Sequence, residues 1–486
     1  MKLKIINYVL RVFSALCLLT VFCQINARQV VGSNLTEKNN LQNSIAKTII
    51  IENVTIIDGT GKPAKSNMRV VVKGNRIESV EPVSPNSKIP VGTRLIDGKG
   101  KFLIPGLWDT HVHLNDIGEA AIPILPVYGI TSVRDMGGDI PKLKNWRSQI
   151  ENGKMIGPGI KFCGPMLEGN KESILDWRTD HWLVTNPQQA RETVTKLANE
   201  GVDCIKMRTY ANPETYFALA AAAKEHNLRL VGHAPWGIDP IQSSNSGQRS
   251  YEHGWYPDPW HTLTPEKKRE VTDTFRKNGS LVVPTLIAWE TRRFSFETVN
   301  TLVNDYEAKS DPRLKLVSAS LRKNWLYDLK DLKGMNIGSP GWNKALDSEF
   351  EQIAEMHDNG VGMMVGTDSG APLVFPGFSV HQELELLVNK CRFTPMDAIL
   401  AATIIPAKFF GIEDQLGTIE KGKLADMVLL SANPLEEIAN TKKIDGVILK
   451  GKWLDRKELD KITIKVEKRV AQSYKSNGML KTRKTK

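Results

Sequence analysis

The sequence contains few cysteines, with five in 486 residues. Cys17 and Cys23 lie within the first 27 residues, which leaves Cys163, Cys204 and Cys391 in the rest of the chain. An odd number without CxxC spacing argues against a disulfide framework. All three lie in apolar segments typical of strands or helices, where a buried cysteine behaves as a small apolar side chain. We therefore expect three buried free thiols.

The sequence also lacks an apolar run long enough to span a bilayer comfortably. Near the N-terminus, residues 12–23 are apolar, follow a basic start without acidic residues and precede the small residue Ala27. This order is typical of a signal peptide over residues 1–27, with cleavage near Arg28. We expect a secreted or periplasmic protein with no stable membrane insertion after cleavage. An uncleaved N-terminal anchor is the alternative.

Excess charge is absent from the body of the chain. The formal net charge is +11, of which residues 1–27 carry +3 and residues 465–486 carry +7, which leaves +1 for the rest. A nearly neutral body argues against nucleic acid as a partner. We interpret residues 465–486 as a basic C-terminal tail that extends into solvent.

Internal repeats and low-complexity segments are absent as well. Short alternating strands with glycine turns occur at residues 47–83 and again at residues 417–431 and 445–455. Because these strand-rich segments flank a long middle region, we expect one composite β-sandwich domain from residues 28–104 and 411–464.

The middle region, residues 105–410, contains eight short apolar runs, each followed by polar or helical sequence. This alternation predicts an α/β fold, a (β/α)8 TIM-like barrel. The interval of about 75 residues before the last run is too long for one crossover and predicts extra helices or a lid. The runs are residues 104–112, 130–135, 159–163, 202–208, 229–233, 250–253, 281–286 and 362–367.

Residues with metal-ligand chemistry occur at the ends of these runs. His111 and His113 are two apart, so both imidazoles lie on one face of an extended strand. His233, His253 and Asp368 close three other runs. The carboxyl ends of barrel strands meet at one rim, so these side chains are predicted to converge on a metal.

The chain resembles the amidohydrolase superfamily, most closely the imidazolonepropionase-related branch with metal-dependent prolidases and other Xaa-dipeptide hydrolases. The resemblance covers almost all of the sequence after residue 27. It is carried by the motifs GLWDTHVHL, GITSVRDMGG, VDCIKM, VGHA, YEHG, GTDSG and LGTIEKGKLADMVLL.

The resemblance implies a centre of two divalent ions, with Zn²⁺ as the expected metal. Lys206 lies in an apolar run, where an unpaired charge is costly to bury. In related enzymes a lysine on the fourth strand carries a CO₂-derived carbamate that bridges the two metals. The implied ligands are His111, His113 and Asp368 on one metal, His233 and His253 on the other, and Lys206 between them.

The same resemblance implies a mechanism. A hydroxide that bridges the metals attacks the substrate, and Asp368 takes its proton and returns it to the leaving nitrogen. The expected reaction is cleavage of a C–N bond in a small substrate such as a dipeptide, N-acyl amino acid or cyclic amide. A lactonase or phosphotriesterase-like hydrolase and a non-catalytic scaffold are the alternatives. The number of subunits stays open, a homo-oligomer included.

Four further residues are candidates for substrate binding. Tyr210 follows Lys206 by four residues, where related dipeptidases place a tyrosine near the substrate. Arg178 and His181 follow the third run and could grip a carboxylate. His381, after the eighth run, resembles a position near the mouth of the family's active site.

Overall fold

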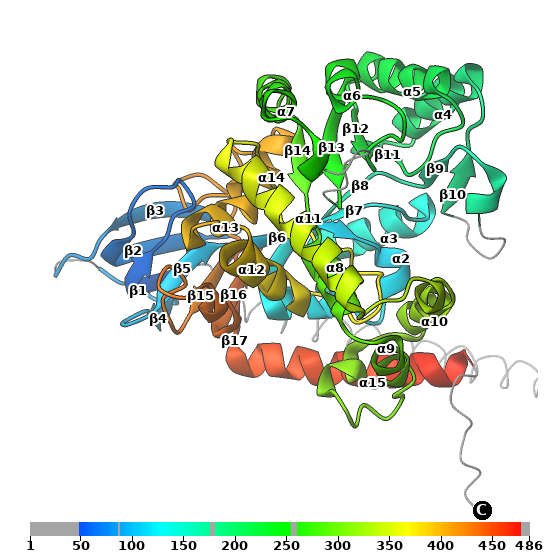
Figure 1. Ribbon diagram of the computed structural model, residues 1–486. Coiled ribbons are helices and arrows are strands. Elements are labelled where there is room, and N and C mark those ends of the chain that lie inside the picture. The colour runs from blue at the N-terminus through cyan, green and yellow to red at the C-terminus, as the bar shows by residue number, and fades with distance from the viewer. Residues whose placement is uncertain (1–47, 86–87, 175–179, 254–259, 478–486) are drawn as a thin grey trace, which may run out of the picture.

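The computed structural model describes residues 48–85, 88–174, 180–253 and 260–477. The predicted signal peptide and Arg178 lie outside these residues. Helices and parallel strands alternate along the middle of the chain, and strands from its two ends form a separate sheet (Figure 1). The fold class is therefore α/β, as the sequence predicts.

The strands of the middle region form two parallel sheets. All neighbours run parallel, so the carboxyl ends within each sheet lie at the same edge. One sheet has the order β6 (Leu107–Val112), β7 (Ile130–Asp135), β8 (Gly159–Phe162). The other has the order β10 (His181–Leu183), β9 (Met166–Glu168), β11 (Cys204–Met207), β12 (Arg229–Gly232), β13 (Gln248–Glu252), β14 (Leu281–Val283). Strands β6, β7 and β11 are short and buried along their whole length.

Residues 362–369 connect the two sheets. Met363 pairs with β14 and Ser369 pairs with β6, each through a single parallel bridge. The predicted eighth strand therefore exists as isolated bridges and not as a regular strand. Its position between β14 and β6 brings Asp368 beside the carboxyl end of β6.

Four helices of the middle region have starts of one kind that are encoded locally. Asn186, Asn212, Asp239 and Thr264 each accept a hydrogen bond from a backbone N–H of the first turn, and each precedes a proline at the first helical position. The helices that follow them are α4 (Pro187–Asn199), α5 (Pro213–Glu225), α6 (Pro240–Ser246) and α7 (Pro265–Asn278). Outside residues 286–360, the middle region also contains α2 (Leu114–Ile117), α3 (Ile140–Glu151), α12 (Phe378–Lys390), α13 (Pro395–Ala401) and α14 (Ile404–Phe410). Within the described ranges no helix combines the length and apolar character that crossing a membrane requires.

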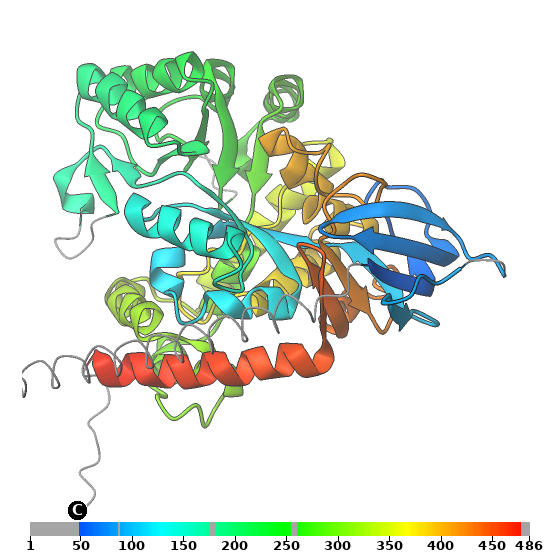
Figure 2. The ribbon, with the colours of Figure 1, turned by 180° about the vertical axis from the view of Figure 1, so that it is seen from behind.

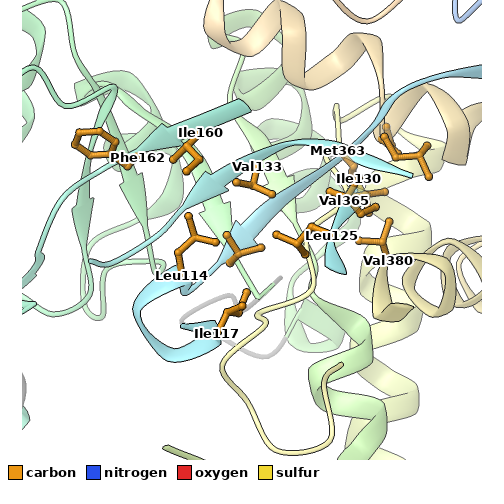
Figure 3. Packing of buried hydrophobic residues seen from close by; sticks show 14 of the residues in the cluster. Leu114, Ile117, Leu125, Ile130, Val133, Ile160, Phe162, Met363, Val365 and Val380 are labelled. Carbon is orange, nitrogen blue, oxygen red and sulfur yellow. The ribbon is translucent and has the colours of Figure 1, made fainter. Parts of the chain in front are cut away.

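One large apolar core joins these helices to the strands. Figure 3 shows part of it, in which Val133 of β7 and Met363 and Val365 of the connecting segment belong to the same cluster. A rigid packed layer therefore lies beneath the strand ends that carry the candidate ligands.

The long interval between β14 and residue 362 is helical, as predicted. It contains α8 (Leu286–Glu290), α9 (Phe296–Val303), α10 (Ala319–Gly334) and α11 (Pro340–Asp358). We call residues 286–360 the helical insertion. Part of it has an apolar cluster of its own around the fully buried Trp325, so this part is a packed unit and not a loose loop.

Strands from both ends of the chain form one eight-stranded sheet, drawn in blue and orange in Figure 1. The prediction of a composite β-region agrees with this sheet, but the sandwich is corrected: β5 pairs with β1 on one side and β15 on the other, so the two halves are continuous. The order is β17-β16-β15-β5-β1-β2-β3, with β4 beside β1. The strands are β1 (Thr48–Ile56), β2 (Lys65–Lys73), β3 (Arg76–Pro82), β4 (Arg94–Asp97), β5 (Phe102–Pro105), β15 (Met427–Leu430), β16 (Ile444–Leu449) and β17 (Lys452–Asp455).

The predicted solvent-exposed tail is also corrected. Helix α15 (Arg456–Ser476) runs along the molecule as a single long helix, red in Figure 2, so residues 465–476 are helical. Its apolar side chains recur every three or four residues and are buried, which is the pattern of a helix packed on one face. They are Leu459, Ile462, Val466, Val470 and Tyr474. The net charge of residues 465–486 gives no sign of this apolar face, and for this reason the helix was not predicted.

The expectation of three free thiols is wrong for two of the cysteines. Cys163, just after β8, and Cys204, the first residue of β11, form a disulfide with a Cα–Cα distance of 4.4 Å. The fold brings two neighbouring strands together here although the cysteines are 41 residues apart, and no local spacing signals such a pair. Cys391 is a buried free thiol, as predicted.

Candidate metal centre

His111, His113 and Asp368 form a compact group that could hold a metal ion. Their ligand atoms all lie within 4.8 Å of one another. His111 ends β6 together with Val112, His113 follows, and the backbone N–H of Asp368 donates to the His111 carbonyl at 2.8 Å. Asp368 has a positive φ of 57°, which few non-glycine residues adopt and which is frequent at functional sites.

The orientation of the His111 ring is set by Glu252. His111 Nδ1 and Glu252 Oε2 are 2.8 Å apart, and both side chains are buried. An ionised carboxylate can only accept, so His111 Nδ1–H donates and Nε2 carries the free lone pair. Nε2 is buried without a hydrogen-bond partner and lies 3.5 Å from Asp368 Oδ1. A lone pair and a carboxylate oxygen that face each other repel, and a cation between them relieves this repulsion. The residues therefore fit a metal.

Glu252 in turn is held by Arg134 of β7. Arg134 Nη2 donates to both carboxylate oxygens at 2.9 Å, and both side chains are fully buried. Arg134 Nε also donates to the Thr110 carbonyl at 2.6 Å. Burial alone would raise the pKa of Glu252, but the charge of Arg134 and the hydrogen bond of His111 hold this pKa well below its usual range. Glu252 is therefore a permanent acceptor for His111.

Lys206, His233 and His253 adjoin the compact group but are not part of it. The ring centroids of His111 and His253 are 4.8 Å apart, and those of His233 and His253 are 5.0 Å apart. His253 Nδ1 is 2.8 Å from Thr285 Oγ1, which holds the ring with Nε2 turned away from the hydroxyl. Lys206 is buried on β11, and its amine has no hydrogen bond or ion pair with any residue that the structure describes.

Burial sets the protonation of this cluster. It lowers the pKa of His111 to about 4 and, as the largest cause, lowers the pKa of His253 to about 3. Burial would raise the pKa of Asp368, but the neighbouring histidines outweigh it and hold this pKa well below its ordinary value. At neutral pH His111 and His253 are neutral and Asp368 is anionic, which is the state in which they bind a divalent ion.

Above the cluster lies a cavity of about 930 Å³. His111, His113, Lys206, His233, His253, Asp368 and Glu252 line it, and residues of the helical insertion line it as well. Side chains of α10 reach the cavity at spacings of three and four residues, which is one face of the helix. The insertion contributes Ala288, Trp289, Arg292, Asn324, Tyr327, Asp328, Asp331, Leu332, Met335 and Trp342.

The predicted substrate residues have different positions. His181 lines the cavity and its Nδ1 is 3.0 Å from Glu168 Oε1. Tyr210 is not among the lining side chains and packs against Tyr216, with ring centroids 5.8 Å apart. His381 is corrected: it is fully buried away from the cavity, where its ring nitrogens lie 3.0 Å from Thr441 Oγ1 and 3.1 Å from the Tyr128 carbonyl.

Sequence reasoning missed Glu252 and Arg134. Both carried a usable signal, because each is a charged residue inside a predicted strand, and burying such a charge requires a partner.

Residues 102–454 match the amidohydrolase family. The chain is 33% identical over 433 residues to a putative aminohydrolase of Methanothermobacter thermautotrophicus, covering 84% of this chain and 99% of that protein. It is 21% identical over 463 residues to a 5-methylthioadenosine/S-adenosylhomocysteine deaminase of Caldanaerobacter subterraneus subsp. tengcongensis, covering 87% and 97%. Among solved structures, a putative prolidase from Bifidobacterium longum superposes with a TM-score of 0.64 at 25% identity, covering 87% of this chain and 99% of that one.

Proposed function

Because this chain belongs to the amidohydrolase family, we propose that it is a metal-dependent hydrolase that cleaves a carbon–nitrogen bond of a small substrate. The observation that carries the proposal is the cluster of His111, His113 and Asp368 on the wall of a cavity of about 930 Å³, with a buried imidazole lone pair turned toward a carboxylate. This arrangement fits a bound cation, and the cavity has room for a small substrate beside it.

We further propose that the two parallel sheets belong to one closed (β/α)8 barrel. Backbone hydrogen bonds across the gaps between them support this proposal. Thr110 N–H donates to the Val365 carbonyl at 2.9 Å, Val282 N–H donates to the Gly362 carbonyl at 3.0 Å, and Asp203 N–H donates to the Phe162 carbonyl at 2.8 Å. Active sites of such barrels lie at the carboxyl ends of the strands, where the cluster is found.

The proposed centre holds two divalent ions, for which Zn²⁺ suits imidazole and carboxylate ligands. His111, His113 and Asp368 would hold one ion, and His233 and His253 the other. Bound divalent ions lower the pKa of coordinated water and polarise a carbonyl group. Asp368 is placed to accept a proton from that water and to pass it to the leaving nitrogen.

Lys206 is proposed to carry a carbamate. Its amine nitrogen would form a bond to the carbon of CO₂ and lose one proton, which gives an anionic carboxylate on a long side chain. This reaction requires the neutral amine, and burial lowers the pKa of Lys206 to about 8. Lys206 would then supply an anionic ligand for the divalent ions, and the absence of an acid paired with Lys206 in the described part of the chain agrees with that role.

Export to an oxidising compartment is proposed as well. The N-terminal segment has the order of a signal peptide, and the Cys163–Cys204 disulfide gives separate support, because such bonds are rare in the cytosol. Mass spectrometry of the exported protein should find an N-terminus near Arg28. Exported protein that starts at Met1 would contradict cleavage.

The reaction is tested by screening the metal-loaded enzyme against dipeptides, N-acyl amino acids, cyclic amides and lactones. Release of an amine or ammonia is the expected result. Turnover confined to lactones would replace the C–N assignment with the lactonase alternative.

A further inference from the structure

The outward side of helix α15 carries a row of exposed lysines. The apolar side of this helix is buried, and its opposite side faces outward along the edge of the molecule, red in Figure 2. Five lysines on the exposed side recur at intervals of three, four or seven residues, which is one face of an α-helix. They extend over about 27 Å, because an α-helix rises about 1.5 Å per residue. We call them the lysine stripe: Lys457, Lys461, Lys465, Lys468 and Lys475.

Within the described residues the lysine stripe is a row of uncompensated charge. None of its ammonium groups forms a hydrogen bond or ion pair with a residue in the part of the chain that the structure describes. Lysines of other helices differ in this respect. Lys144 Nζ is 2.6 Å from Glu200 Oε2, and Lys267 Nζ is 2.8 Å from Asp239 Oδ2.

The acidic residues of α15 do not neutralise the stripe. Asp460 accepts a hydrogen bond from Arg456 Nε at 2.9 Å, and Glu458 accepts one from the backbone N–H of Asp455 at 3.1 Å. Glu467 is half-buried and has no lysine three or four residues away, the spacings at which side chains of a helix meet. The stripe therefore presents a positive field to a partner that approaches this face.

An exposed apolar side chain lies within the stripe. Ile464 is 51% exposed, and it lies one helical turn from both Lys461 and Lys468. A membrane surface offers anionic headgroups to the ammonium groups and an apolar boundary to such a side chain, whereas a soluble polyanion has no apolar layer. Arginine, which suits bidentate recognition of nucleic-acid phosphates, is not a member of the stripe.

We propose that the lysine stripe attaches the enzyme peripherally to the surface of an anionic phospholipid bilayer. The lysines contact lipid phosphates, Ile464 lies between the headgroups, and no helix crosses the bilayer. None of these side chains lines the cavity, so the proposal does not depend on the proposed reaction.

The test measures binding of the mature full-length enzyme to vesicles by co-sedimentation. Vesicles of phosphatidylcholine alone are compared with vesicles in which about one third of the lipid is phosphatidylglycerol, which gives the surface a negative potential. The enzyme should bind the anionic vesicles and not the neutral ones. Raising the salt from about 0.1 M to about 0.5 M should release it, because salt screens charges at the surface.

Replacing four lysines of the stripe by glutamine should weaken binding to the anionic vesicles at least about 100-fold, because each lysine near such a surface contributes about fivefold. The matched control loses four positive charges from exposed positions on other parts of the molecule, and it should bind within about threefold of the unaltered enzyme. Both should keep the unfolding midpoint of the unaltered enzyme, because all eight side chains are exposed. The stripe variant is K457Q/K461Q/K465Q/K468Q, and the control is K99Q/K224Q/K277Q/K390Q.

Ile464→Ala distinguishes a bilayer from a soluble polyanion. It should weaken binding to the anionic vesicles about 3- to 10-fold and leave binding to heparin unchanged. Lys465→Gln alone should weaken vesicle binding about fivefold, which provides the test if the fourfold variant does not fold. Equal binding to neutral and anionic vesicles, or equal loss of binding in the stripe variant and its control, overturns the proposal. Stripe-dependent binding to heparin without binding to vesicles overturns it as well.

Discussion

At the scale of single residues, the candidate ligands differ from the other buried histidine in what their ring nitrogens face. His111 has one nitrogen fixed by Glu252 and the other free toward Asp368, whereas His381 has hydrogen-bonding partners at both nitrogens. Strand alternation predicted that His111 and His113 lie on one face, and the structure places both beside Asp368. The sequence could not predict the Glu252–Arg134 pair, whose members are 118 residues apart, nor the direction in which the His381 side chain points.

Lys206→Ala tests the carbamate at this scale. The carbamate would supply an anionic bridge, so its loss should lower the metal content from two ions per chain and abolish turnover. A short carboxylate such as acetate or propionate should partly restore both. Lys206→Arg should not be rescued, because a guanidinium stays protonated and fills the space with positive charge. The measurement is metal stoichiometry by elemental analysis. Two ions retained in Lys206→Ala, with residual activity, would remove support for the carbamate.

Glu252→Gln tests the orientation of His111. An amide no longer fixes the ring through a charged hydrogen bond, so metal affinity should fall about 10- to 100-fold, measured by competition with a chelator. Arg134 also loses its buried counterion, which should lower the free energy of unfolding by about 3–5 kcal/mol.

Glu383→Gln is the matched control for Glu252→Gln. Glu383 is another buried glutamate, but it accepts from the backbone N–H groups of Leu286 and Ile287 and contacts no histidine. Its substitution should leave metal affinity unchanged. If Glu252→Gln binds metal as tightly as this control, Glu252 does not position the ligand.

At the scale of elements, contacts between residues far apart in the sequence cannot be predicted from local sequence pattern. Cys163 and Cys204 become neighbours only once the fold brings the end of β8 beside the start of β11, so counting residues predicted free thiols where a disulfide forms. The helix capping signals, by contrast, are local and are visible directly as a cap residue followed by proline. These local signals fix where single helices begin, whereas contacts between strands depend on residues far apart in the chain.

The disulfide predicts a measurable stability difference. It closes a loop of 41 residues, for which the loop-entropy relation gives about 4 kcal/mol. Unfolding in denaturant should therefore be easier after reduction, and the double variant Cys163→Ala/Cys204→Ala should lose this dependence on reductant. Alkylation of the denatured, unreduced mature protein should label Cys391 alone. Labelling of all three cysteines would contradict the disulfide.

The packing of helix α15 against the rest of the molecule can be tested at Tyr474, its last buried side chain. Tyr474 Oη donates to the Val317 carbonyl at 2.7 Å and accepts from Arg322 Nε at 3.1 Å. Tyr474→Phe leaves these buried groups unpaired and should lower the free energy of unfolding by about 1–3 kcal/mol. Ile464→Ala is the control, because Ile464 is 51% exposed on the same helix. Equal unfolding midpoints for the two variants would favour a detached, solvent-exposed tail.

At the scale of the whole molecule, the order of predicted strands and helices along the chain is more informative about the architecture than the amino-acid composition is. The α/β class was predictable, because apolar runs alternate with helical sequence along the middle of the chain. That strands from both ends of the chain would meet was also predictable. A sandwich was predicted instead of one sheet because the pairing of β5 on both of its edges has no signature in either strand alone.

The central claim is that residues of this cavity hold divalent ions that hydrolyse a C–N bond. Metal content and turnover should be measured together, on the mature full-length enzyme before chelation, after chelation and after reconstitution with Zn²⁺ and bicarbonate. We predict two ions per chain, loss of amine release when they are removed, and recovery when they are restored. Amine release that continues at the same rate in metal-free enzyme would contradict the account.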